Sequence, residues 1–311
     1  MLILGDIGNS VTKLFLVNPK DKILKKISLP SKSISNSILN KKFKILTKDF
    51  KNIEKILFCS VVPKTFNSIK RFISKKTKVK CYEIKDLNLK SILNIKANFK
   101  QVGSDRLANA ISLMSPKKNF IILDFGTATT FDVLANNTYR GGVIAPGISI
   151  SLNTLTDKAS LIPKINLKKI KKVIGIDTNS AVRSGFFWGY AGLIDNIINL
   201  IKKETGKSYK VVITGGFADL FKNSIKTKVI ENKDITVKGL IKISKLLNNS
   251  LSFSAFLFVL FETVITDTFN LYKAKIRDGT TPPAPRIKIF FPFISFLVSL
   301  IADLKPSISV L

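Results

Sequence analysis

Leu2-Ile-Leu-Gly-Asp-Ile-Gly-Asn-Ser-Val-Thr-Lys13 and Ile121-Ile-Leu-Asp-Phe-Gly-Thr-Ala-Thr-Thr-Phe131 are two copies of one sequence pattern. In each copy an apolar strand ends at an aspartate, a glycine follows two positions later, and small polar residues fill the turn before a second apolar strand. Glycine lets the backbone turn tightly, and exposed N–H groups together with Asn, Ser and Thr side chains donate to phosphate oxygens. The pattern therefore predicts two phosphate-binding hairpins.

The two copies also predict a duplication. They align Asp6 with Asp124, Gly8 with Gly126 and Thr12 with Thr130. The aspartate at the end of each first strand offers a hard oxygen ligand for a cation that accompanies the phosphates. We therefore expect two related domains with a nucleotide between them.

Charge narrows the class of partner. The 311 residues carry a net charge of +31, which by itself indicates nucleic acid or an anionic membrane surface. However, 45 of the 51 basic residues are Lys, whereas a nucleic-acid footprint is clustered and richer in Arg. We interpret the excess of lysine as the codon bias of an AT-rich genome expressed on a solvated protein surface. We therefore expect no nucleic-acid partner.

The chain contains no histidine and only two cysteines, Cys59 and Cys81. Without histidine, His-based triads and His metal sites are excluded, and proton abstraction falls to a carboxylate, Lys or Tyr. The two distant cysteines match no metal-site or disulfide spacing, which fits a reducing compartment. The sequence begins directly in a predicted strand, with no signal peptide ahead of it. We therefore expect a cytoplasmic location.

Strand and helix signals alternate along the chain, which predicts an α/β fold. The predicted strands are Leu2 to Asp6, Thr12 to Val17, Lys55 to Val62, Phe120 to Leu123 and Val211 to Gly216. The predicted helices are Thr65 to Ser74, Asp105 to Met114, Ser149 to Leu155 and Ser180 to Lys202, and another begins at Ala218. Gly141 to Gly147 indicates a glycine-rich loop. Within the longest helix, Gly185, Gly189 and Gly192 indicate close helix packing.

The composition changes near Leu247. Lysines become sparse, and nine phenylalanines fall between Asn249 and Leu311. Neither apolar run, Ser252 to Phe261 nor Ile289 to Ile301, reaches the roughly 18 to 20 residues that a membrane span needs. Three interpretations of this tail stay open: contact with a membrane surface, an added packing element, or an out-of-frame or fused extension.

A third motif, Gly103-Ser-Asp-Arg106, lies between an extended segment and a predicted helix. The helix dipole favours an ionised Asp105, which can orient and deprotonate an acceptor hydroxyl, as phosphoryl transfer requires. Arg106 can bind a substrate carboxylate or phosphate through two hydrogen bonds. In isolation such a motif is more typical of a capping aspartate beside a surface arginine.

Six motifs in this order resemble the type III pantothenate kinases. They are Asp6-Ile-Gly-Asn-Ser-x-x-Lys13, Gly103-Ser-Asp-Arg106, Asp124-Phe-Gly-Thr-Ala-Thr129, Gly141-Gly-x-Ile-x-Pro-Gly147, Ile174-Gly-Ile-Asp-Thr178 and Thr214-Gly-Gly216. The resemblance runs from Met1 to about Leu247, because Asp234-Ile-Thr-Val-Lys-Gly-Leu-Ile is similar to the family's closing segment. It implies an α/β fold of the acetate and sugar kinase, heat-shock protein 70 and actin superfamily. Two duplicated ribonuclease-H-like domains, 1–115 and 116–248, would hold the nucleotide between them, followed by an atypical hydrophobic tail, 249–311.

The resemblance implies a reaction and a set of roles. The reaction is transfer of the ATP γ-phosphoryl group to the primary hydroxyl of pantothenate, which gives 4'-phosphopantothenate in the first step of coenzyme A biosynthesis. The implied ATP contacts are Asp6, Ile7, Gly8, Asn9, Ser10, Val11, Thr12, Lys13 and Thr127, with Gly215 and Gly216 near the adenosine. The implied pantothenate contacts are Gly103, Ser104, Asp105, Arg106 and Thr178, and Asp105 is the implied proton acceptor. Asp124 would bind a monovalent cation, K⁺ or NH4⁺, and Asp6 would help to place Mg²⁺.

The resemblance also implies a homodimer that buries part of the pantothenate site at its interface. The sequence departs from the family's pattern at a few positions. Lys96 replaces a common tyrosine, a common proline near Phe99 is missing, Ile176-Asp177 replaces Lys-Asn, and Phe217 replaces a smaller aliphatic residue. Lys96 and Phe99 bear on the wall of the pantothenate site.

Two other functions stay open on the sequence. A kinase of the same fold for another small hydroxylated substrate would keep both hairpins but not the meaning of Gly103 to Arg106. A non-catalytic regulatory or accessory DNA-associated relative fits the charge of +31, since relatives of these kinases have been named as accessory transcription factors. Three acidic residues beside an anionic nucleotide, Asp6, Asp105 and Asp124, argue against that second reading.

Overall fold

The structure is a computed structural model that describes residues 1–47 and 49–247. The chain divides into two compact units, Met1–Ser244 and Lys245–Leu311. Both sheets lie in the first unit. The interpretations of the tail 249–311, including a membrane contact, lie outside the described residues. Within these limits, no helix is both long and apolar enough to span a bilayer.

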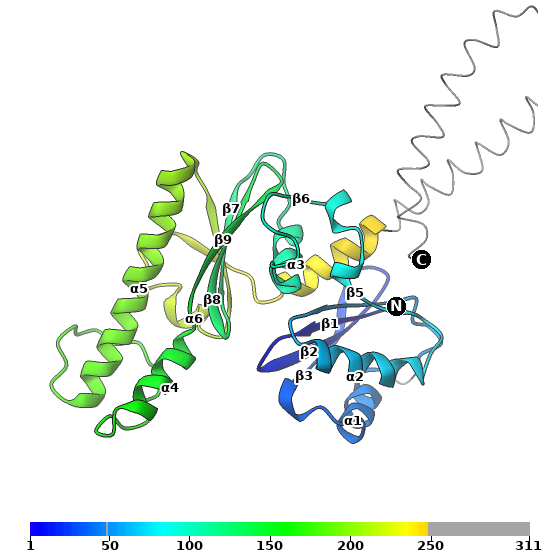
Figure 1. Cartoon of the computed structure of the whole chain (residues 1–311), viewed down its shortest axis with the longest axis horizontal. Coiled ribbons are helices and arrows are strands. Elements are labelled where there is room, and N and C mark those ends of the chain that lie inside the picture. The colour runs from blue at the N-terminus through cyan, green and yellow to red at the C-terminus, as the bar shows by residue number, and fades with distance from the viewer. Residues whose placement is uncertain (48, 248–311) are drawn as a thin grey trace, which may run out of the picture. The chain divides into compact units, whose positions relative to one another are not determined.

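The first sheet has five strands in the order β3-β2-β1-β4-β5 (Figure 1). These are β1 Leu2–Ile7, β2 Val11–Val17, β3 Ile23–Pro30, β4 Lys55–Ser60 and β5 Cys81–Glu83. The pairs β1–β2 and β2–β3 are antiparallel, whereas β1–β4 and β4–β5 are parallel. The predicted strands at Leu2 and Thr12 are therefore confirmed as one hairpin.

The second sheet has six strands in the order β11-β10-β7-β8-β9-β6. These are β6 Asn94–Ile95, β7 Phe120–Phe125, β8 Ala128–Ala135, β9 Thr138–Pro146, β10 Lys210–Gly215 and β11 Val229–Glu231. Read from β9 to β11, it repeats the first sheet: the pairs β9–β8 and β8–β7 are antiparallel, and β7–β10 and β10–β11 are parallel. Both predicted hairpins thus occupy the same place in their sheets, and the predicted mixed α/β fold is confirmed.

The register of the hairpins corrects the sequence alignment by one position. In the first hairpin Asp6 lies opposite Lys13 and Ile7 opposite Thr12; in the second, Asp124 lies opposite Thr130 and Phe125 opposite Thr129. The second turn is one residue shorter, so the structural counterpart of Thr12 is Thr129, and that of Lys13 is Thr130. Counting residues from the aspartate does not detect this difference.

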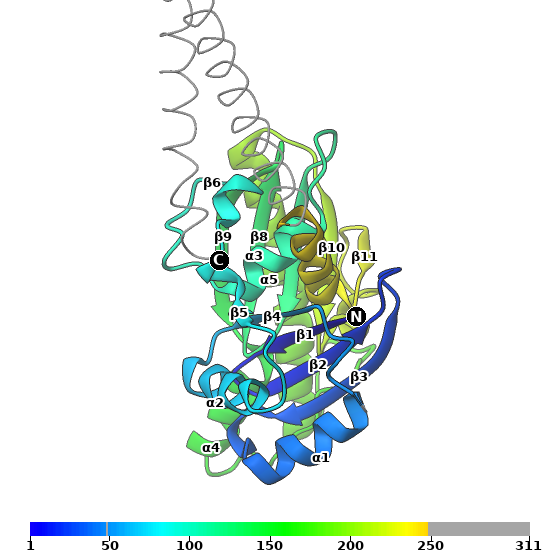
Figure 2. The same cartoon turned by 90° about the vertical axis from the view of Figure 1, so that its right-hand side faces the viewer.

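Helices cover both sheets (Figure 2). They are α1 Asn36–Leu46, α2 Pro63–Ser74, α3 Ser104–Ser112, α4 Ile148–Lys158, α5 Thr178–Thr205 and α6 Ala218–Phe221, together with 3-10 turns η1 Ser31–Ser33, η2 Ile84–Asp86 and η3 Leu89–Ser91. Residues 235–247 form a further helix. Apolar side chains of α1 and α2 fill the core of the first sheet, and those of α5 and α6 fill the core of the second. Pro63 is the first residue of α2, where a proline loses no hydrogen bond.

The predicted glycine-rich loop at Gly141 to Gly147 is wrong, because most of this segment belongs to β9. The β8–β9 register shifts between Val133 and Leu134, opposite the point where Gly141 takes a φ of 123°. A Cβ at Gly142 would lie 2.0 Å from the backbone oxygen of Phe131 on β8. The glycines therefore serve a bulged strand and a close backbone approach.

The glycines of α5 also differ from expectation. A Cβ at Gly185, Gly189 or Gly192 would meet nothing within 4 Å in the part of the chain that the structure describes. All three glycines are exposed, and their spacing places them along one side of the helix. The expected close packing is therefore not made by residues 1–47 and 49–247.

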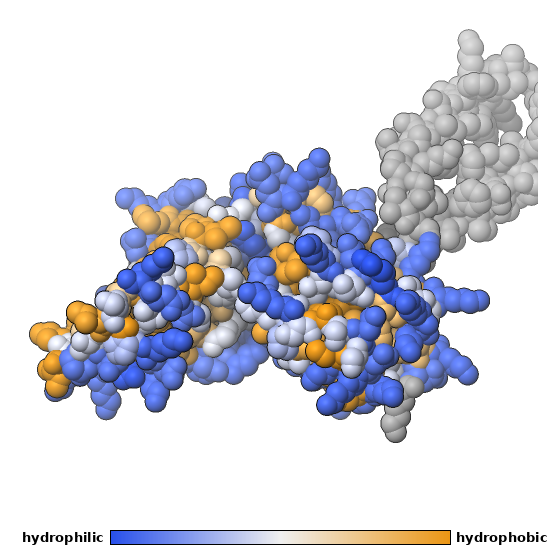
Figure 3. Space-filling view, turned by 60° about the horizontal axis from the view of Figure 1, so that its bottom comes forward, coloured by the Kyte–Doolittle hydropathy of each residue, from blue (hydrophilic) through white to orange (hydrophobic). Residues whose placement is uncertain are grey.

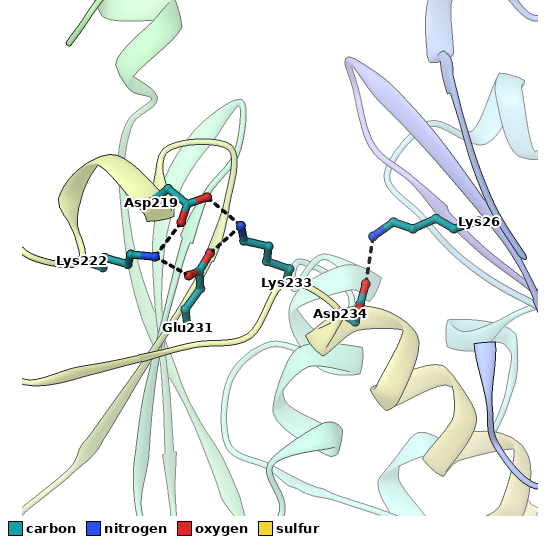
Figure 4. A network of polar contacts seen from close by, with 6 residues as sticks. All are labelled: Lys26, Asp219, Lys222, Glu231, Lys233 and Asp234. Carbon is teal, nitrogen blue, oxygen red and sulfur yellow. Dashed lines mark hydrogen bonds and ion pairs between the residues drawn. The ribbon is translucent and has the colours of Figure 1, made fainter. Parts of the chain in front are cut away.

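Polar contacts and backbone fit hold the helix at 235–247. Lys26 of β3 reaches the start of this helix, because its Nζ lies 2.9 Å from Oδ1 of Asp234, the residue just before it. A network of ion pairs lies beside this contact and contains Asp219, Lys222, Glu231 and Lys233 (Figure 4). A Cβ at Gly239 would lie 2.0 Å from the backbone oxygen of Ala108, so this helix lies directly against α3. Because α3 also contacts β4 and β8, it bridges the two sheets.

Candidate active site

The first hairpin places a carboxylate and an ammonium group beside an exposed turn. Asp6 is the penultimate residue of β1, and its Oδ2 lies 3.6 Å from Lys13 Nζ on β2. The Gly8 N–H donates to the Val11 backbone oxygen at 3.1 Å, which closes the turn. Asn9, Ser10 and Val11 are exposed, whereas Ile7 and Thr12 are buried. The turn therefore presents its tip to solvent and roots its base in the core.

Residues outside the motif support this turn. Ser31 Oγ donates to the Gly8 backbone oxygen at 2.6 Å and lies 2.9 Å from Thr12 Oγ1. Thr12 is fully buried, so its side chain braces the hairpin from below. The sequence pattern did not identify Ser31, because it belongs to η1, well beyond the hairpin.

The second hairpin faces the first. Its turn is closed by the Gly126 N–H, which donates to the Ala128 backbone oxygen at 3.1 Å. Thr127 is exposed at the tip, and its Oγ1 lies 3.4 Å from Ser10 Oγ of the first hairpin. A Cβ at Gly147, the N-cap of α4, would lie 1.9 Å from the Thr127 backbone oxygen. The two predicted phosphate turns are thus brought together, although they are far apart in the sequence.

Asp105 enters the site at the N-terminus of α3. Gly103 is the N-cap, and the Arg106 N–H donates to Asp105 Oδ1 at 2.8 Å. A Cβ at Gly103 would lie 2.5 Å from Asp105 Oδ1, so this position has to be a glycine if the carboxylate is to fold back. Ser104 Oγ accepts from the Ser60 N–H at 2.7 Å and donates to the Ser60 backbone oxygen at 3.0 Å. The helix start is therefore fixed to the end of β4.

Glu83 is a further carboxylate near this helix start that the sequence did not single out. Its Oε1 accepts from the Ser60 N–H at 3.2 Å, and its Oε2 accepts from the Lys85 N–H at 2.7 Å. Glu83 is the last residue of β5. The parallel pairing of β5 with β4 brings it next to the end of β4.

The charge of Asp105 raises the pKa of two other carboxylates, Asp6 and Asp124. Burial, together with the charges of Asp105 and Asp6, raises the pKa of Asp124 to about 7. Burial also raises the pKa of Asp6, against the opposing charge of Lys13. The pKa of Asp105 is raised by burial as well, against the hydrogen bond and charge of Arg106. The sequence predicted that the helix dipole would keep Asp105 ionised. In the structure burial has the larger effect and raises the pKa of Asp105.

The oxygen-rich surroundings fit a cation that arrives with phosphates. Gly215 has a φ of 91°, and a Cβ there would lie 2.6 Å from Asp124 Oδ1 and 2.5 Å from the Phe125 backbone oxygen. Because Gly215 has no Cβ, a space stays open between Asp124 Oδ1 and the Phe125 backbone oxygen. We call this space the cradle. Hard oxygens of this kind are the ligands of K⁺ and Mg²⁺. Across 1–47 and 49–247, no three acidic, cysteine or histidine side chains converge as a metal site. A divalent ion here would depend on phosphate oxygens and water for its other ligands, as Mg²⁺ commonly does.

The comparison with known proteins decides the family. A family model described as type III pantothenate kinase matches residues 2–200, well over half of the chain. The chain belongs to the type III pantothenate kinase family. A type III pantothenate kinase of Pelagibacter ubique (strain HTCC1062) is 65% identical over 247 residues, which cover 79% of this chain and 100% of that relative. Another, from Desulfosudis oleivorans (strain DSM 6200 / JCM 39069 / Hxd3), is 34% identical over 77% of this chain and 97% of its own length.

Solved structures show that the fold is shared more widely than the family. A Sinorhizobium meliloti protein assigned as a 2-dehydro-3-deoxygalactonokinase superposes with a TM-score of 0.54 at 10% identity, over 79% of this chain and 99% of that one. A Campylobacter jejuni protein assigned to the Baf family of transcriptional activators gives a TM-score of 0.52 at 21% identity, with the same coverage. At these identities the likeness concerns the fold alone.

The remaining family motifs lie on α5 and around β10. Thr178 opens α5 and is exposed, and Asp177 caps the helix by accepting from the Ser180 N–H at 2.9 Å. The Gly216 N–H donates to the Phe125 backbone oxygen at 3.0 Å, which holds the β10 turn beside the second hairpin. Thr178 therefore belongs to a different element from the two hairpins and α3.

The departures from the family pattern have ordinary structural environments. Lys96 donates its N–H to the Tyr139 backbone oxygen at 2.9 Å. The ring of Phe99 lies under two ammonium groups, those of Lys85 at 5.5 Å and Lys90 at 5.8 Å from its centroid. Phe217 precedes α6 and packs against the second core.

The raised pKa values predict that the ligand-free protein loses stability as the pH rises. Asp124, with a folded pKa of about 7, keeps a proton that its unfolded form releases near its ordinary value of 3.8. Its contribution to stability is therefore complete below the unfolded pKa and is lost as the pH rises through about 7. Asp132 acts in the same direction up to about pH 6. We expect a lower melting temperature at about pH 8 than at about pH 5, by about 2–4 °C for each kcal/mol.

Differential scanning fluorimetry without nucleotide checks this expectation. Asp124→Asn removes the titrating group, so its melting temperature should change less over the same pH range than that of the parent chain. A melting temperature of the parent chain that is constant or rises toward about pH 8 would contradict the prediction.

Proposed function

We propose that this chain is an ATP-dependent pantothenate kinase, which transfers the γ-phosphoryl group of ATP to the primary hydroxyl of pantothenate in the first step of coenzyme A biosynthesis. One observation carries the proposal: the two hairpins meet where Ser10 Oγ lies 3.4 Å from Thr127 Oγ1, and α3 begins with Asp105 near enough to raise the pKa of Asp6 and Asp124 at their bases. The match of the family model over residues 2–200 supports pantothenate as the acceptor.

The residues of the chain divide the work of this reaction. The turn from Asp6 to Lys13 binds the ATP phosphates, with Thr127 as a contact from the other hairpin. Gly103 to Arg106 bind pantothenate, and Asp105 accepts the proton of its hydroxyl. A raised pKa suits Asp105 to this role, because a base works best when its pKa approaches the working pH. Gly215 and Gly216 line the adenosine side.

Asp124 and Asp6 are the residues that we assign to cations. Asp124 holds K⁺ or NH4⁺ in the cradle that Gly215 leaves open, and Asp6 helps to place Mg²⁺. When bound, these ions offset negative charge on the phosphates. Positioning of the acceptor hydroxyl by the protein then supplies the remainder of the catalysis.

The architecture supports a duplication. The two sheets repeat one strand order and one pattern of parallel and antiparallel pairs. We propose that 1–115 and 116–248 are duplicated ribonuclease-H-like domains and that ATP binds between them. The shared position of both hairpins in their sheets is the feature that favours this reading.

We further propose a homodimer, in which a second copy covers α5 and completes the pantothenate site with Thr178. Thr178 is exposed, and so are the glycines at 185, 189 and 192. Apolar side chains gather over α4 and the segment that follows it, where Leu161 is 91% and Ile176 96% exposed (Figure 3). Such a surface favours a partner.

The free thiols of Cys59 and Cys81 fit the cytoplasmic location that we propose for the enzyme.

A coupled ADP-release assay tests the function. With Mg²⁺ and K⁺ present, we expect the purified chain to release ADP with pantothenate, and to release little with pantetheine or with a panel of sugars. Turnover with a sugar and not with pantothenate would indicate a different kinase of this fold. Salt-sensitive binding of duplex DNA without any ATP turnover would favour the non-catalytic alternative.

A further inference from the structure

A buried ion pair lies directly behind the Gly103 to Arg106 segment. Arg106 Nε and Nη2 each lie 2.8 Å from Asp132 Oδ1, and the Tyr139 hydroxyl donates to the same oxygen at 2.5 Å. Asp132 belongs to β8 and Tyr139 to β9, and both are fully buried, whereas the Arg106 side chain keeps 14% of its surface exposed. The Arg106 side chain therefore keeps some contact with solvent, whereas its two partners have none.

This arrangement is poorly suited to stability alone. A buried ion pair recovers its desolvation cost only if the remaining hydrogen-bonding positions are filled. Asp132 Oδ2 is buried and has no hydrogen-bond partner in the described part of the chain, while Oδ1 accepts from both Arg106 and Tyr139. Burial raises the pKa of Asp132 to about 6 in spite of the Arg106 charge. A carboxylate kept under these conditions is better explained by what it does to Arg106.

The geometry restricts the guanidinium to one orientation. Nε and Nη2 form one side of the planar group, and Asp132 occupies that side. A Cβ at Gly142 would lie 2.8 Å from Arg106 Nη2, so even one methyl group on β9 would displace it. The donors of Nη1 are on the other side of the group from Nε and are not used by Asp132. Arg106 also acts electrostatically on Asp105, with which it would be free to pair if released.

We propose that Asp132, assisted by Tyr139, is a positioning residue for the acceptor substrate: it holds Arg106 by its Nε side, so that the Nη1 side stays available for an anionic oxygen of the substrate and away from Asp105. The inference rests on the proposed function, because it assigns to Arg106 a contact with pantothenate. It adds two buried residues, neither of which touches substrate, to the specificity of that contact.

Steady-state kinetics of the full chain test the proposal with a double-mutant cycle. For Asp132→Asn we expect kcat/KM for pantothenate to fall on the order of 10²-fold, while the KM for ATP stays within about twofold. Tyr139→Phe, which removes one hydrogen bond, should cost roughly fivefold in the same parameter. In an Arg106→Gln background, Asp132→Asn should have little further effect, because Asp132 acts through Arg106.

Asp234→Asn is the matched structural control, because Asp234 Oδ1 lies 2.9 Å from Lys26 Nζ and neither residue is assigned to the site or to the proposed dimer surface. It should lower the melting temperature and leave both KM values unchanged. The proposal is overturned if Asp132→Asn leaves kcat/KM for pantothenate unchanged or changes the kinetic parameters for ATP and pantothenate equally. It is also overturned if the effects of the Asp132 and Arg106 substitutions are additive. If Asp132→Asn does not fold, Tyr139→Phe decides. A parent chain inactive with pantothenate would instead refute the proposed function.

Discussion

Asp105→Asn is expected to remove most phosphoryl transfer, by about 10²- to 10⁴-fold in kcat, while ATP still binds. The amide keeps the shape of the carboxylate and can still accept the Arg106 N–H, which lies 2.8 Å from Oδ1. It cannot take up the proton of an acceptor hydroxyl. The hairpins that we assign to ATP are separate elements, so their binding should survive. Stopped-assay rates together with calorimetric ATP titration measure the two effects independently.

Asp86→Asn is the control for Asp105→Asn. Asp86 is an exposed aspartate of η2 in the same half of the chain, and its loss should leave the rate within about twofold. If Asp105→Asn retained full activity, Asp105 would not be the proton acceptor. If it lost ATP binding as well, the damage would extend to the hairpins, and the separation of roles proposed here would be wrong.

Asp124→Asn is expected to abolish stimulation by K⁺. Its carboxylate shares a cradle with the Phe125 backbone oxygen that exists only because Gly215 has no Cβ. Loss of an outer-shell partner alone costs roughly 10–100-fold in metal affinity, so loss of the ligand itself should cost at least as much. The rate of Asp124→Asn should therefore be low and nearly independent of K⁺.

A titration with KCl at constant ionic strength, balanced with choline chloride, measures this effect. Asp157→Asn, at an exposed position of α4, should keep the K⁺ response of the parent chain. If Asp124→Asn still responded to K⁺ with an unchanged midpoint, the cation site would have to be assigned to other residues. If neither protein responded to K⁺, the monovalent cation would not belong to this enzyme.

Much of the site was predictable because its parts are local. A strand that ends in Asp-x-Gly and continues into a second strand can form only a tight hairpin, and both such hairpins are confirmed. The start of α3 was also predicted to within a residue, since Gly103 and Asp105 are typical of a helix N-terminus. The order of these motifs along the chain was sufficient to indicate the family.

Features that depend on contacts between distant segments were not predictable. The glycines of β9 indicated a loop, because the sequence does not reveal that Phe131 and Arg106 crowd Gly142. The pKa of Asp105 was expected to be lowered by the helix dipole, but burial raises it. Asp132 drew no attention, since an aspartate within an apolar strand carries no local signal of its partner.

The sequence by itself determined the two hairpins, the helix that presents Asp105 and the family to which the chain belongs. Only the tertiary structure decided that Ser10 and Thr127 lie 3.4 Å apart, that the second turn is one residue shorter than the first, and that Arg106 is held by Asp132. The physical reason is the range of the interactions. Turn and helix preferences act between neighbours in the chain, whereas the packing of two sheets through α3 sets distances and ionisation between residues more than a hundred positions apart.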